Sequence, residues 1–302
     1  MSEHWVGVDV GGTKVLAVRI DEAGDVEATA TRPMPGRAAG AEAVEEAVAL
    51  AARDVYGARP PRALGVSAAG LVDADGERFL FGAHLPWRDT PLRRRLAERT
   101  GRPVVVDNDA NCAAHAELLA GAARGVRSAL LITIGTGIGG AVVLDGRVVR
   151  GAHGLAGEFG HVQVVPDGLA CECGLRGCWE QYCSGRALER VTRVALGRHL
   201  DGPEVTALAL AGDEVALQSF ASIGTWLGVG AAGLVSAFDP ELVVVGGGVS
   251  AVGDLLLGPA RTAMRGSLQG TAYRPVPELV PARLGPEAGA IGAALLARDG
   301  RS

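Results

Sequence analysis

The sequence has no strong excess of charge of either sign. Its 302 residues carry a formal net charge of −5, and the 29 lysines and arginines are scattered along the chain instead of being gathered into one arm or stripe. A surface that binds nucleic acid needs concentrated positive charge, so we expect no nucleic acid among the partners of this protein. The sequence also lacks a low-complexity linker and a solenoid repeat.

Long hydrophobic runs are absent as well. No apolar stretch approaches the roughly 20 residues that a membrane-spanning helix needs, and the opening MSEHWVGVDV lacks the basic and apolar regions of a signal peptide. We therefore expect a soluble, cytoplasmic protein with no membrane partner. The hydrophobic content of 48%, with 21% charged residues, excludes a disordered or fibrous chain and favours two cores over one.

Cysteine is scarce, and its spacing excludes a secreted disulfide framework. Three of the five cysteines, Cys171, Cys173 and Cys178, fall within eight residues, which is too local a cluster for such a framework. Metal binding is the natural alternative. Cys112 and Cys183 lie outside the cluster, and we expect them to pack as small hydrophobic residues without a chemical role.

Strand and helix signals at the start of the chain predict an α/β fold. Residues 5–10 form an apolar segment, a glycine pair follows, and residues 15–20 form the returning strand of a hairpin. A third strand is predicted at 26–32, and residues 41–55 have the Ala- and Glu-rich composition of a helix. Strands followed by a helix indicate an α/β layer.

The opening pattern recurs in the middle of the chain. Residues 128–134 are apolar, a glycine-rich tip follows, residues 141–144 return, and an Asp-Gly turn leads to a short strand at 148–149. This internal similarity predicts two related domains that face a cleft. A buried strand is predicted at 242–245, and a helix of small residues at 288–297.

Polar loops follow two further predicted strands. The strand at 63–67 leads to the loop around Gly70, and the strand at 103–106 leads into a polar run and then an alanine-rich helix. Ligands of open α/β sheets gather beyond the carboxyl ends of the strands, so both loops are candidate walls of a site. Ordinary polar loop chemistry is the alternative.

The two glycine tips are candidate phosphate-binding sites. Asp9, near the first tip, offers a carboxylate to a hydrated Mg²⁺, and the glycines after it let the backbone approach a phosphate. In the second tip, Thr136 lies among four glycines, where free amides and one hydroxyl could hold phosphate oxygens. The first tip lacks the spacing of a Walker A loop, and glycine-tipped hairpins also occur without a ligand. The first tip comprises Gly11, Gly12, Thr13 and Lys14.

Asn108 and Asp109 follow the strand at 103–106 and precede a predicted helix. A carboxylate at this place could accept the proton of an attacking hydroxyl while transfer of the γ-phosphoryl group of ATP is stabilised electrostatically. Asn108 would orient the same acceptor. Asp and Asn are also ordinary N-cap residues, and the local spacing does not distinguish the two roles.

A further cluster joins carboxylates, thiols and an imidazole. It runs from Glu158 through His161 and the three clustered cysteines to Glu180. Three thiolates and one imidazole form a closed Zn²⁺ shell, and Gly174 and Gly177 supply the bends that bring the last cysteine back toward the metal. We predict a structural zinc, because four protein ligands leave no open position for catalysis. A group of reduced, buried cysteines is the alternative.

Six motifs occur in order along the chain: DVGGTK, VVVDNDAN, TIGTGIGGAVV, GEFGHV, CECGLRGCWEQY and VVVGGGVS. Taken together, they resemble the ROK family of bacterial sugar kinases and regulators, and the zinc block is most similar to that of actinobacterial ROK glucokinases. The resemblance implies an actin-like ATPase (ribonuclease H-like) fold of two α/β domains with a cleft between them. Residues 1–112 and 288–302 would form the small domain, and 113–287 the large, zinc-binding domain.

The resemblance also implies an activity and the residues that perform it. It predicts a glucokinase that uses ATP with Mg²⁺, holds a structural zinc and takes the proton of the sugar 6-hydroxyl with Asp109. The implied sugar contacts are Gly70, Asn108, Asp109, Glu158, His161 and Glu180. The implied nucleotide contacts are Asp9, Gly11, Gly12, Thr13, Lys14, Thr136, Gly137, Gly246, Gly247 and Gly248, and the implied zinc ligands are His161, Cys171, Cys173 and Cys178.

Other substrates and one other function stay open at this point. A kinase for mannose, fructose, N-acetylglucosamine or N-acetylmannosamine shares most hydroxyl contacts with a glucokinase. A sugar-responsive regulator without catalysis is the second alternative, but regulatory members carry a helix-turn-helix before the first glycine tip, and Asp9 comes too early for one.

The sequence departs from the family pattern at two places that bear on sugar contact. SAAGLVD stands where relatives often have a GxPG turn, and His84 stands where many have an asparagine. The family implies a homodimer or homotetramer.

Overall fold

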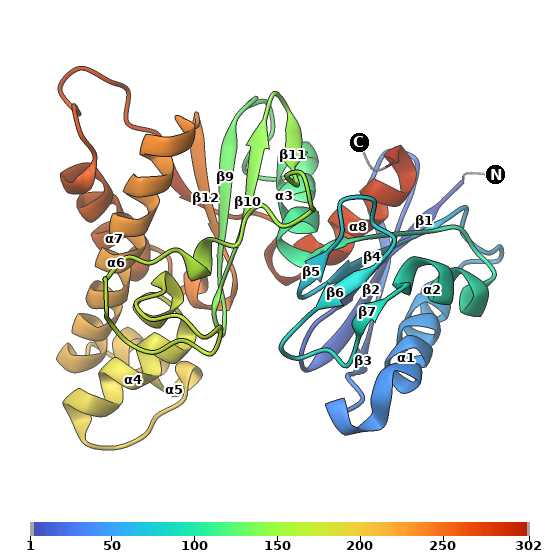
Figure 1. The fold of residues 1–302 in the computed structure, drawn as a ribbon, viewed down its shortest axis with the longest axis horizontal. Helices are drawn as coiled ribbons and strands as arrows, with labels where there is room; N and C mark the ends of the chain where they lie inside the picture. The colour runs from blue at the N-terminus through green and yellow to red at the C-terminus, as the bar shows by residue number, and fades with distance from the viewer. Residues whose placement is uncertain (1–2, 301–302) are drawn as a thin grey trace. The chain divides into compact units, whose positions relative to one another are not determined.

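The computed structural model describes residues 3–300, which form two compact units; Figure 1 shows the fold. Unit 1 comprises the residues up to 125, residues 141–157 and the residues from 283 onward, and unit 2 comprises residues 126–140 and 158–282. The chain therefore passes from one unit to the other four times. The domain boundaries predicted from the sequence, at residues 112 and 288, remain predictions.

Unit 1 is built on a five-stranded mixed sheet with the strand order β3-β2-β1-β4-β8. β1 (Trp5–Val10) and β2 (Lys14–Ile20) form the predicted antiparallel hairpin, and β3 (Val26–Pro33) continues it. β4 (Leu64–Ala68) lies parallel to both β1 and β8 (Val104–Asn108). Since the carboxyl ends of parallel strands meet at one edge, the residues that follow β1, β4 and β8 share that edge.

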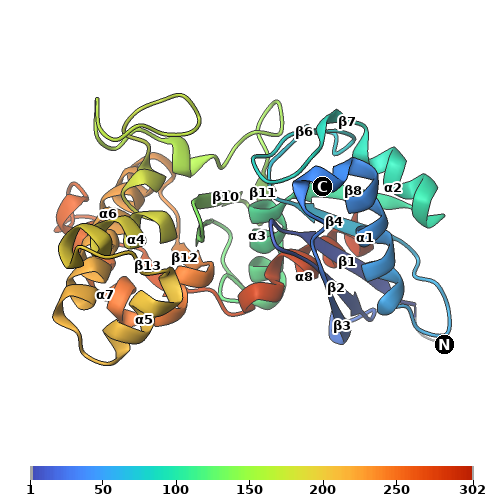
Figure 2. The ribbon, with the colours of Figure 1, turned by 90° about the horizontal axis from the view of Figure 1, so that it is seen from below.

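Helices cover both faces of this sheet (Figure 2). α1 (Gly40–Asp54) and α2 (Leu92–Thr100) lie on one face, and α3 (Asp109–Ala120) and α8 (Ala288–Asp299) lie on the other. A glycine lets α8 rest directly on β1, because a Cβ added at Gly7 would lie 1.9 Å from the Ala290 carbonyl oxygen. The close approach of helix and strand therefore excludes any side chain at this position.

A small three-stranded sheet in unit 1 was not predicted. It consists of β5 (Leu71–Val72), β6 (Phe79–Phe81) and β7 (Arg88–Thr90). Trp87 anchors it, because its fully buried ring meets Phe79 edge-on with ring centroids 5.4 Å apart. The indole nitrogen of Trp87 donates to a buried glutamate carboxylate of α1 at 3.2 Å, which satisfies the polar end of the ring.

A second five-stranded sheet has the order β11-β10-β9-β12-β13. β9 (Ala129–Ile134), β12 (Leu242–Gly246) and β13 (Glu278–Pro281) are parallel, whereas β10 (Ile138–Leu144) and β11 (Arg147–Val149) form an antiparallel hairpin.

The Asp-Gly turn between β10 and β11 was predicted, and both of its residues have positive φ angles, 51° at Asp145 and 74° at Gly146. The start of β10 was not predicted correctly. The strand begins at Ile138 and includes two glycines that were assigned to the glycine-rich tip. At Gly140 the reason is packing, because a Cβ there would lie 2.1 Å from the ring of Phe159.

The helices of unit 2 are α4 (Gly185–Leu196), α5 (Gly202–Leu210), α6 (Glu214–Phe238) and α7 (Asp254–Ser267). Among the described residues, α6 is the one helix that is long and apolar enough to cross a membrane, so the prediction that no apolar stretch approaches this length was wrong. Within the fold, 44% of its apolar window is buried. Gly228 lets it pack closely on α7, since a Cβ there would lie 2.2 Å from the Ala260 carbonyl oxygen. The apolar face of α6 thus packs in the core of unit 2.

Five short 3-10 helices complete the described secondary structure. They are η1 (Arg37–Ala39), η2 (Phe159–His161), η3 (Trp179–Gln181), η4 (Gly248–Val252) and η5 (Gly285–Glu287).

Glu117, in α3, is a buried carboxylate that ties together distant parts of unit 1. One oxygen accepts hydrogen bonds from the amides of Arg283 and Leu284, both at 2.9 Å, and the other accepts from the amide of Ala122 at 2.6 Å. The side chain is 1% exposed. Glu117 therefore anchors the chain both where it leaves α3 and where it returns before α8.

Replacing Glu117 with alanine is expected to lower the free energy of unfolding by about 3 kcal/mol, because three backbone donors lose their acceptor. Chemical denaturation measures this change. Glu98→Ala is the matched control, since the ion pair of Glu98 with Arg94 is exposed and 3.9 Å long, and such pairs contribute little. Equal effects of the two substitutions would contradict the anchoring role of Glu117.

Candidate active site and metal centre

Asp9 lies near the carboxyl end of β1, the central strand of the sheet, and it is partly buried. Burial raises the pKa of Asp9, while the hydrogen bond from Ser67 and the charge of Lys14 act in the opposite direction. Ser67 Oγ, on β4, donates to Asp9 Oδ1 at 2.5 Å. The first turn of α8 approaches as well, because a Cβ at Gly289 would lie 2.8 Å from the same oxygen. Ser67 and Gly289 position Asp9, and neither was predicted.

The first glycine tip joins β1 to β2. The amide of Gly11 donates to the carbonyl oxygen of Lys14 at 3.1 Å and closes the turn, whereas Gly12, Thr13 and Lys14 are exposed. His84 packs against the tip, since a Cβ at Gly12 would lie 3.5 Å from the Cβ of His84. The tip thus offers accessible backbone to a phosphate group.

Asn108 and Asp109 lie where β8 passes into α3. Asn108 is the N-cap of α3, and its Oδ1 accepts hydrogen bonds from the amides of Ala110 at 2.9 Å and Asn111 at 3.1 Å. Its Nδ2 donates to the Gly70 carbonyl oxygen and to Asp109 Oδ1, both at 3.0 Å. Asn108 therefore both caps the helix and orients the Asp109 carboxylate.

A buried ion pair lies directly beside Asn108. Arg150 Nε, just after β11, lies 2.8 Å from Asp107 Oδ2, and the other oxygen of Asp107 accepts the amide of Asn108 at 2.9 Å. The side chain of Asp107 is 2% exposed and that of Arg150 is 11% exposed. No local pattern connects residues that are 43 positions apart, so Arg150 was not predicted at the site.

A cavity of about 710 Å³ lies within unit 2 beside the second glycine tip. Its volume falls within the range of small-molecule sites. Of the predicted nucleotide contacts, Thr136 and Gly248 line this cavity. The start of α4 and one side of α5 supply most of the rest, and these helices were not predicted. The lining residues are Gly135, Thr136, Gly185, Arg186, Leu188, Glu189, Gly202, Pro203, Thr206, Ala207, Leu210, Gly248 and Val249.

The other glycines predicted to contact the nucleotide lie outside this lining. A Cβ at Gly137 would lie 2.4 Å from Glu180 Oε2, so this glycine allows the glutamate to approach the second tip. Gly247 has a φ angle of 86°, and a Cβ there would lie 2.4 Å from the Ile134 carbonyl oxygen. Gly246 is the last residue of β12.

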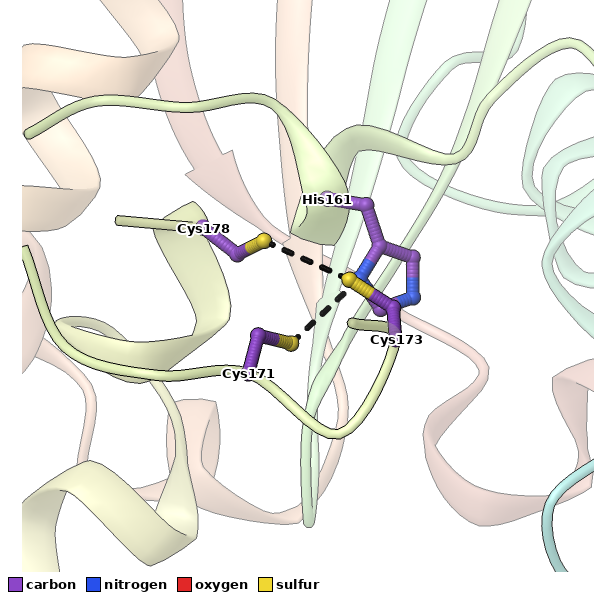
Figure 3. A group of neighbouring side chains, drawn as sticks. All are labelled: His161, Cys171, Cys173 and Cys178. Atoms are coloured by element: carbon purple, nitrogen blue, oxygen red, sulfur yellow. Dashed lines mark hydrogen bonds between the residues drawn. The ribbon is translucent and has the colours of Figure 1, made fainter. Parts of the chain in front are cut away.

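The four predicted zinc ligands lie together in unit 2, and Figure 3 shows their side chains gathered around one point. The ligand atoms of His161, Cys171, Cys173 and Cys178 all lie within 4.8 Å of one another. Cys171 Sγ is 3.8 Å from His161 Nδ1, and Cys173 Sγ is 3.6 Å from Cys178 Sγ. Tetrahedral zinc with Zn–S bonds of about 2.3 Å separates its sulfur ligands by about 3.7 Å, so this donor set fits Zn²⁺.

The backbone around the metal cluster bends where the glycines were predicted to bend it. Gly174 and Gly177 have φ angles of 93° and 76°, which favour glycine. At Gly177 any side chain is also excluded, because a Cβ would lie 1.7 Å from the Val165 carbonyl oxygen. The two turns bring Cys178 back beside Cys173.

Two of the three thiols in the cluster ionise less readily than a free cysteine. Burial raises the pKa of Cys178 to about 12, and it raises the pKa of Cys171 above its usual value. A coordinating metal ion supplies the positive charge that makes such thiols ionise. Cys183, outside the cluster, is fully buried, and burial raises the pKa of its thiol too.

Two carboxylates adjoin the metal cluster. Glu180 Oε1 lies 3.2 Å from Cys171 Sγ and 3.9 Å from His161 Nδ1. Burial raises the pKa of Glu158; the charge of Glu180 acts in the same direction, and His161 acts against it. The structure therefore brings Glu158, His161 and Glu180 together in unit 2, whereas Asp109 lies in unit 1.

The fold and these clusters define a sugar kinase of the actin-like ATPase fold, as predicted. The chain belongs to the ROK family, whose model matches residues 5–300. It is 40% identical to a glucokinase of Streptomyces coelicolor over 97% of each chain.

Two solved structures are similar to the chain along almost its whole length. The first is a ROK family glucokinase from Streptomyces griseus in complex with glucose and AMPPNP, with a TM-score of 0.90 and 41% identity over 98% of this chain and 100% of that one. The second is a ROK hexokinase from Thermus thermophilus, with a TM-score of 0.80 and 42% identity over 97% of both chains. The predicted family is confirmed.

Proposed function

We propose that this protein is a glucokinase, which transfers the γ-phosphoryl group of ATP to the 6-hydroxyl of glucose and releases glucose 6-phosphate and ADP. The observation that carries the proposal is the likeness, along almost the whole chain, to a glucokinase solved with glucose and AMPPNP. The clusters in the structure supply the chemistry that this reaction needs: a carboxylate base, polar groups for a sugar and glycine tips for phosphates.

Asp109 is the proposed general base. It would take the proton of the 6-hydroxyl as that oxygen attacks the γ-phosphorus, and the bond from the γ-phosphorus to the leaving oxygen of ADP would break. The side-chain Nδ2 of Asn108 donates a hydrogen bond to Asp109 Oδ1 at 3.0 Å, which limits the rotation of the carboxylate. We assign the remaining sugar contacts to Gly70, Asn108, Glu158, His161 and Glu180.

The proposed nucleotide site uses both glycine tips. Backbone amides of the tips would stabilise charge on the phosphate oxygens during transfer, and the cavity beside Thr136 and Gly248 would take the adenosine. Asp9 would hold Mg²⁺, which neutralises phosphate charge when it is bound. We assign the nucleotide contacts to Gly11, Gly12, Thr13, Lys14, Thr136, Gly137, Gly246, Gly247 and Gly248.

The zinc is a separate, structural crosslink. We assign its ligands to His161 and the three clustered cysteines.

The cavity assignment predicts a selective effect on ATP. Ala207 is an exposed residue of the cavity lining, so Ala207→Trp should fill the space and raise the KM for ATP about tenfold or more, with little change in the KM for glucose. Steady-state kinetics with each substrate varied in turn measure both values. Ala211→Trp, which lies just beyond the same helix and outside the lining, is the control and should change neither.

We further propose that the enzyme is cytoplasmic, forms a homodimer or homotetramer and has no nucleic-acid partner. The scattered basic residues support the last point, because they form no concentrated patch in the sequence. Light scattering after size exclusion should give two or four times the mass of one chain. A monomer would contradict the assembly that we propose.

An assay of ADP release with a panel of sugars tests the proposed function. The purified protein is given ATP, Mg²⁺ and, in turn, glucose, mannose, fructose, N-acetylglucosamine and N-acetylmannosamine. We expect the highest kcat/KM with glucose. A preference for another sugar would overturn the substrate, and no sugar-dependent ADP release at all would overturn the kinase activity itself.

A further inference from the structure

The residue before Asn108 has no role in the proposed reaction, yet it is one of the few charged side chains that the structure buries almost completely. Asp107 is the next-to-last residue of β8, and its side chain is 2% exposed. A buried carboxylate costs free energy unless it is paired and hydrogen-bonded. The hydrogen-bond and ion-pair partners of Asp107 therefore indicate which part of the structure it positions.

The two carboxylate oxygens of Asp107 contact different groups. Oδ2 lies 2.8 Å from Arg150 Nε, whereas Oδ1 accepts the backbone amide of Asn108 at 2.9 Å and the side-chain amide of Asn111 at 3.3 Å. Arg150 is itself held, because its Nη1 donates to the Val148 carbonyl oxygen at 3.4 Å. The ion pair thus connects the end of β11 with the backbone of the residue that orients Asp109.

We propose that Arg150 and Asp107 form a positioning pair for the catalytic base. Arg150 holds Asp107, Asp107 holds the backbone of Asn108, and the Asn108 side chain holds the Asp109 carboxylate. This inference rests on the proposed function, because it assigns the pair to the same reaction. Neither member of the pair is assigned a contact with sugar or nucleotide.

The energetics of buried ion pairs favour a positional role over a purely stabilising one. Replacing a buried ion pair with packed hydrophobic residues is often neutral or stabilising, so such a pair is weak evidence for stability alone. Proton abstraction, in contrast, depends strongly on the placement of the base. The ion pair of Arg150 and Asp107 fixes the backbone before Asp109, and it can therefore keep the proposed base in place.

The first test replaces Arg150 with methionine, which keeps the apolar stem and removes the cation. We expect kcat with glucose to fall about 10- to 100-fold, with KM for glucose and ATP changed by less than about threefold, because orientation affects the transition state more than ground-state binding. Arg150→Lys restores the cation and should recover at least half of the loss on a logarithmic scale. Arg93→Met is the matched control: Arg93 donates to the carbonyl oxygen of Val104, at the other end of β8, and its loss should leave kcat unchanged.

A double-mutant cycle separates action through Asp107 from direct action on the substrates. Asp107→Asn keeps the shape of the side chain and an acceptor for the Asn108 amide. In the Asp107→Asn background, Arg150→Met should lower kcat by less than about threefold, since its partner charge is already gone. An equal loss in both backgrounds would mean that Arg150 acts on the substrates directly and would overturn the proposal. An unchanged kcat in Arg150→Met alone would overturn it as well.

Hydrogen exchange of the protein without substrates gives a readout that does not depend on turnover. Arg150→Met should speed exchange in the peptide 104–118, which contains the amides that Asn108 caps, and Arg150→Lys should restore protection. Unchanged exchange would contradict the positioning role. If the wild-type protein does not phosphorylate glucose, the proposed function fails, while the exchange result still reports on the pair. Should Arg150→Met not fold, Asp107→Asn and Arg150→Lys supply the same two readouts.

Discussion

Replacing Asp109 with asparagine is expected to lower kcat with glucose by about 10² to 10⁴-fold, the range that general base catalysis contributes. The substitution is isosteric and keeps an oxygen that can accept the hydrogen bond from Asn108 Nδ2. It removes the basicity of the carboxylate, which proton abstraction needs, and leaves the placement of the side chain unchanged. Circular dichroism and the melting temperature should stay unchanged, and glucose binding by calorimetry should remain measurable.

The matched control for this prediction is Asp254→Asn. Asp254 is the first residue of α7, as Asp109 is the first residue of α3, but its carboxylate is exposed and paired with Arg261. Its replacement should leave kcat unchanged. If Asp109→Asn keeps kcat within about tenfold of the wild-type value, Asp109 is not the base, because that loss lies below the range for such catalysis.

Removal of the metal has the second large expected effect. The purified protein should contain about one zinc per chain, and Cys178→Ser should reduce this content to near zero, since the side chain of Cys178 is fully buried within a four-ligand set. The loop that carries His161 and adjoins Glu180 would then lose its crosslink. We expect the KM for glucose to rise about tenfold or more, which is typical when the support of a site residue is removed.

Elemental analysis and steady-state kinetics measure these two changes. Cys183→Ala is the control, because Cys183 is equally buried but lies outside the cluster. It should keep its zinc and its KM for glucose. Zinc-free protein with an unchanged KM would contradict the proposed role of the metal in sugar binding.

Local patterns in the sequence predicted the parts of the molecule whose chemistry is local. The hairpin of β1 and β2 follows from an apolar segment, two glycines and a second apolar segment, and its strands begin and end within one residue of the predicted positions. The metal cluster was predictable for the same reason. Cys171, Cys173 and Cys178 are close in sequence, and the two glycines between them bend the chain as expected.

The parts that were not predicted depend on contacts between distant residues or on very short strands. The three strands around Trp87 contain at most three residues each, too few to show an alternating pattern. Glu117 and Arg150 are ordinary charged residues in the sequence, and only the fold buries them against amides or a carboxylate from other segments. Much of the cavity wall comes from α4 and α5, whose sequences carry no phosphate-binding pattern.

The segment at Asn108 and Asp109 shows why two readings of one motif can both hold. The sequence offered a helix cap or a catalytic base. The structure assigns the cap to Asn108, and the base remains the role that we propose for Asp109. Asn108 supplies the cap with its oxygen and orients Asp109 with its nitrogen, so the first helical residue presents an oriented carboxylate. Spacing alone could not reveal this division, because it depends on the rotamer of one amide.

The most direct test of the glucokinase assignment compares glucose with 6-deoxyglucose in the presence of ATP and Mg²⁺. The assay measures released ADP, and glucose-6-phosphate dehydrogenase detects glucose 6-phosphate. We predict that glucose gives equal amounts of ADP and glucose 6-phosphate, whereas 6-deoxyglucose, which lacks the accepting hydroxyl, gives neither above the rate without sugar. ADP release that is the same with both sugars, or that yields no glucose 6-phosphate, would contradict transfer to the 6-hydroxyl.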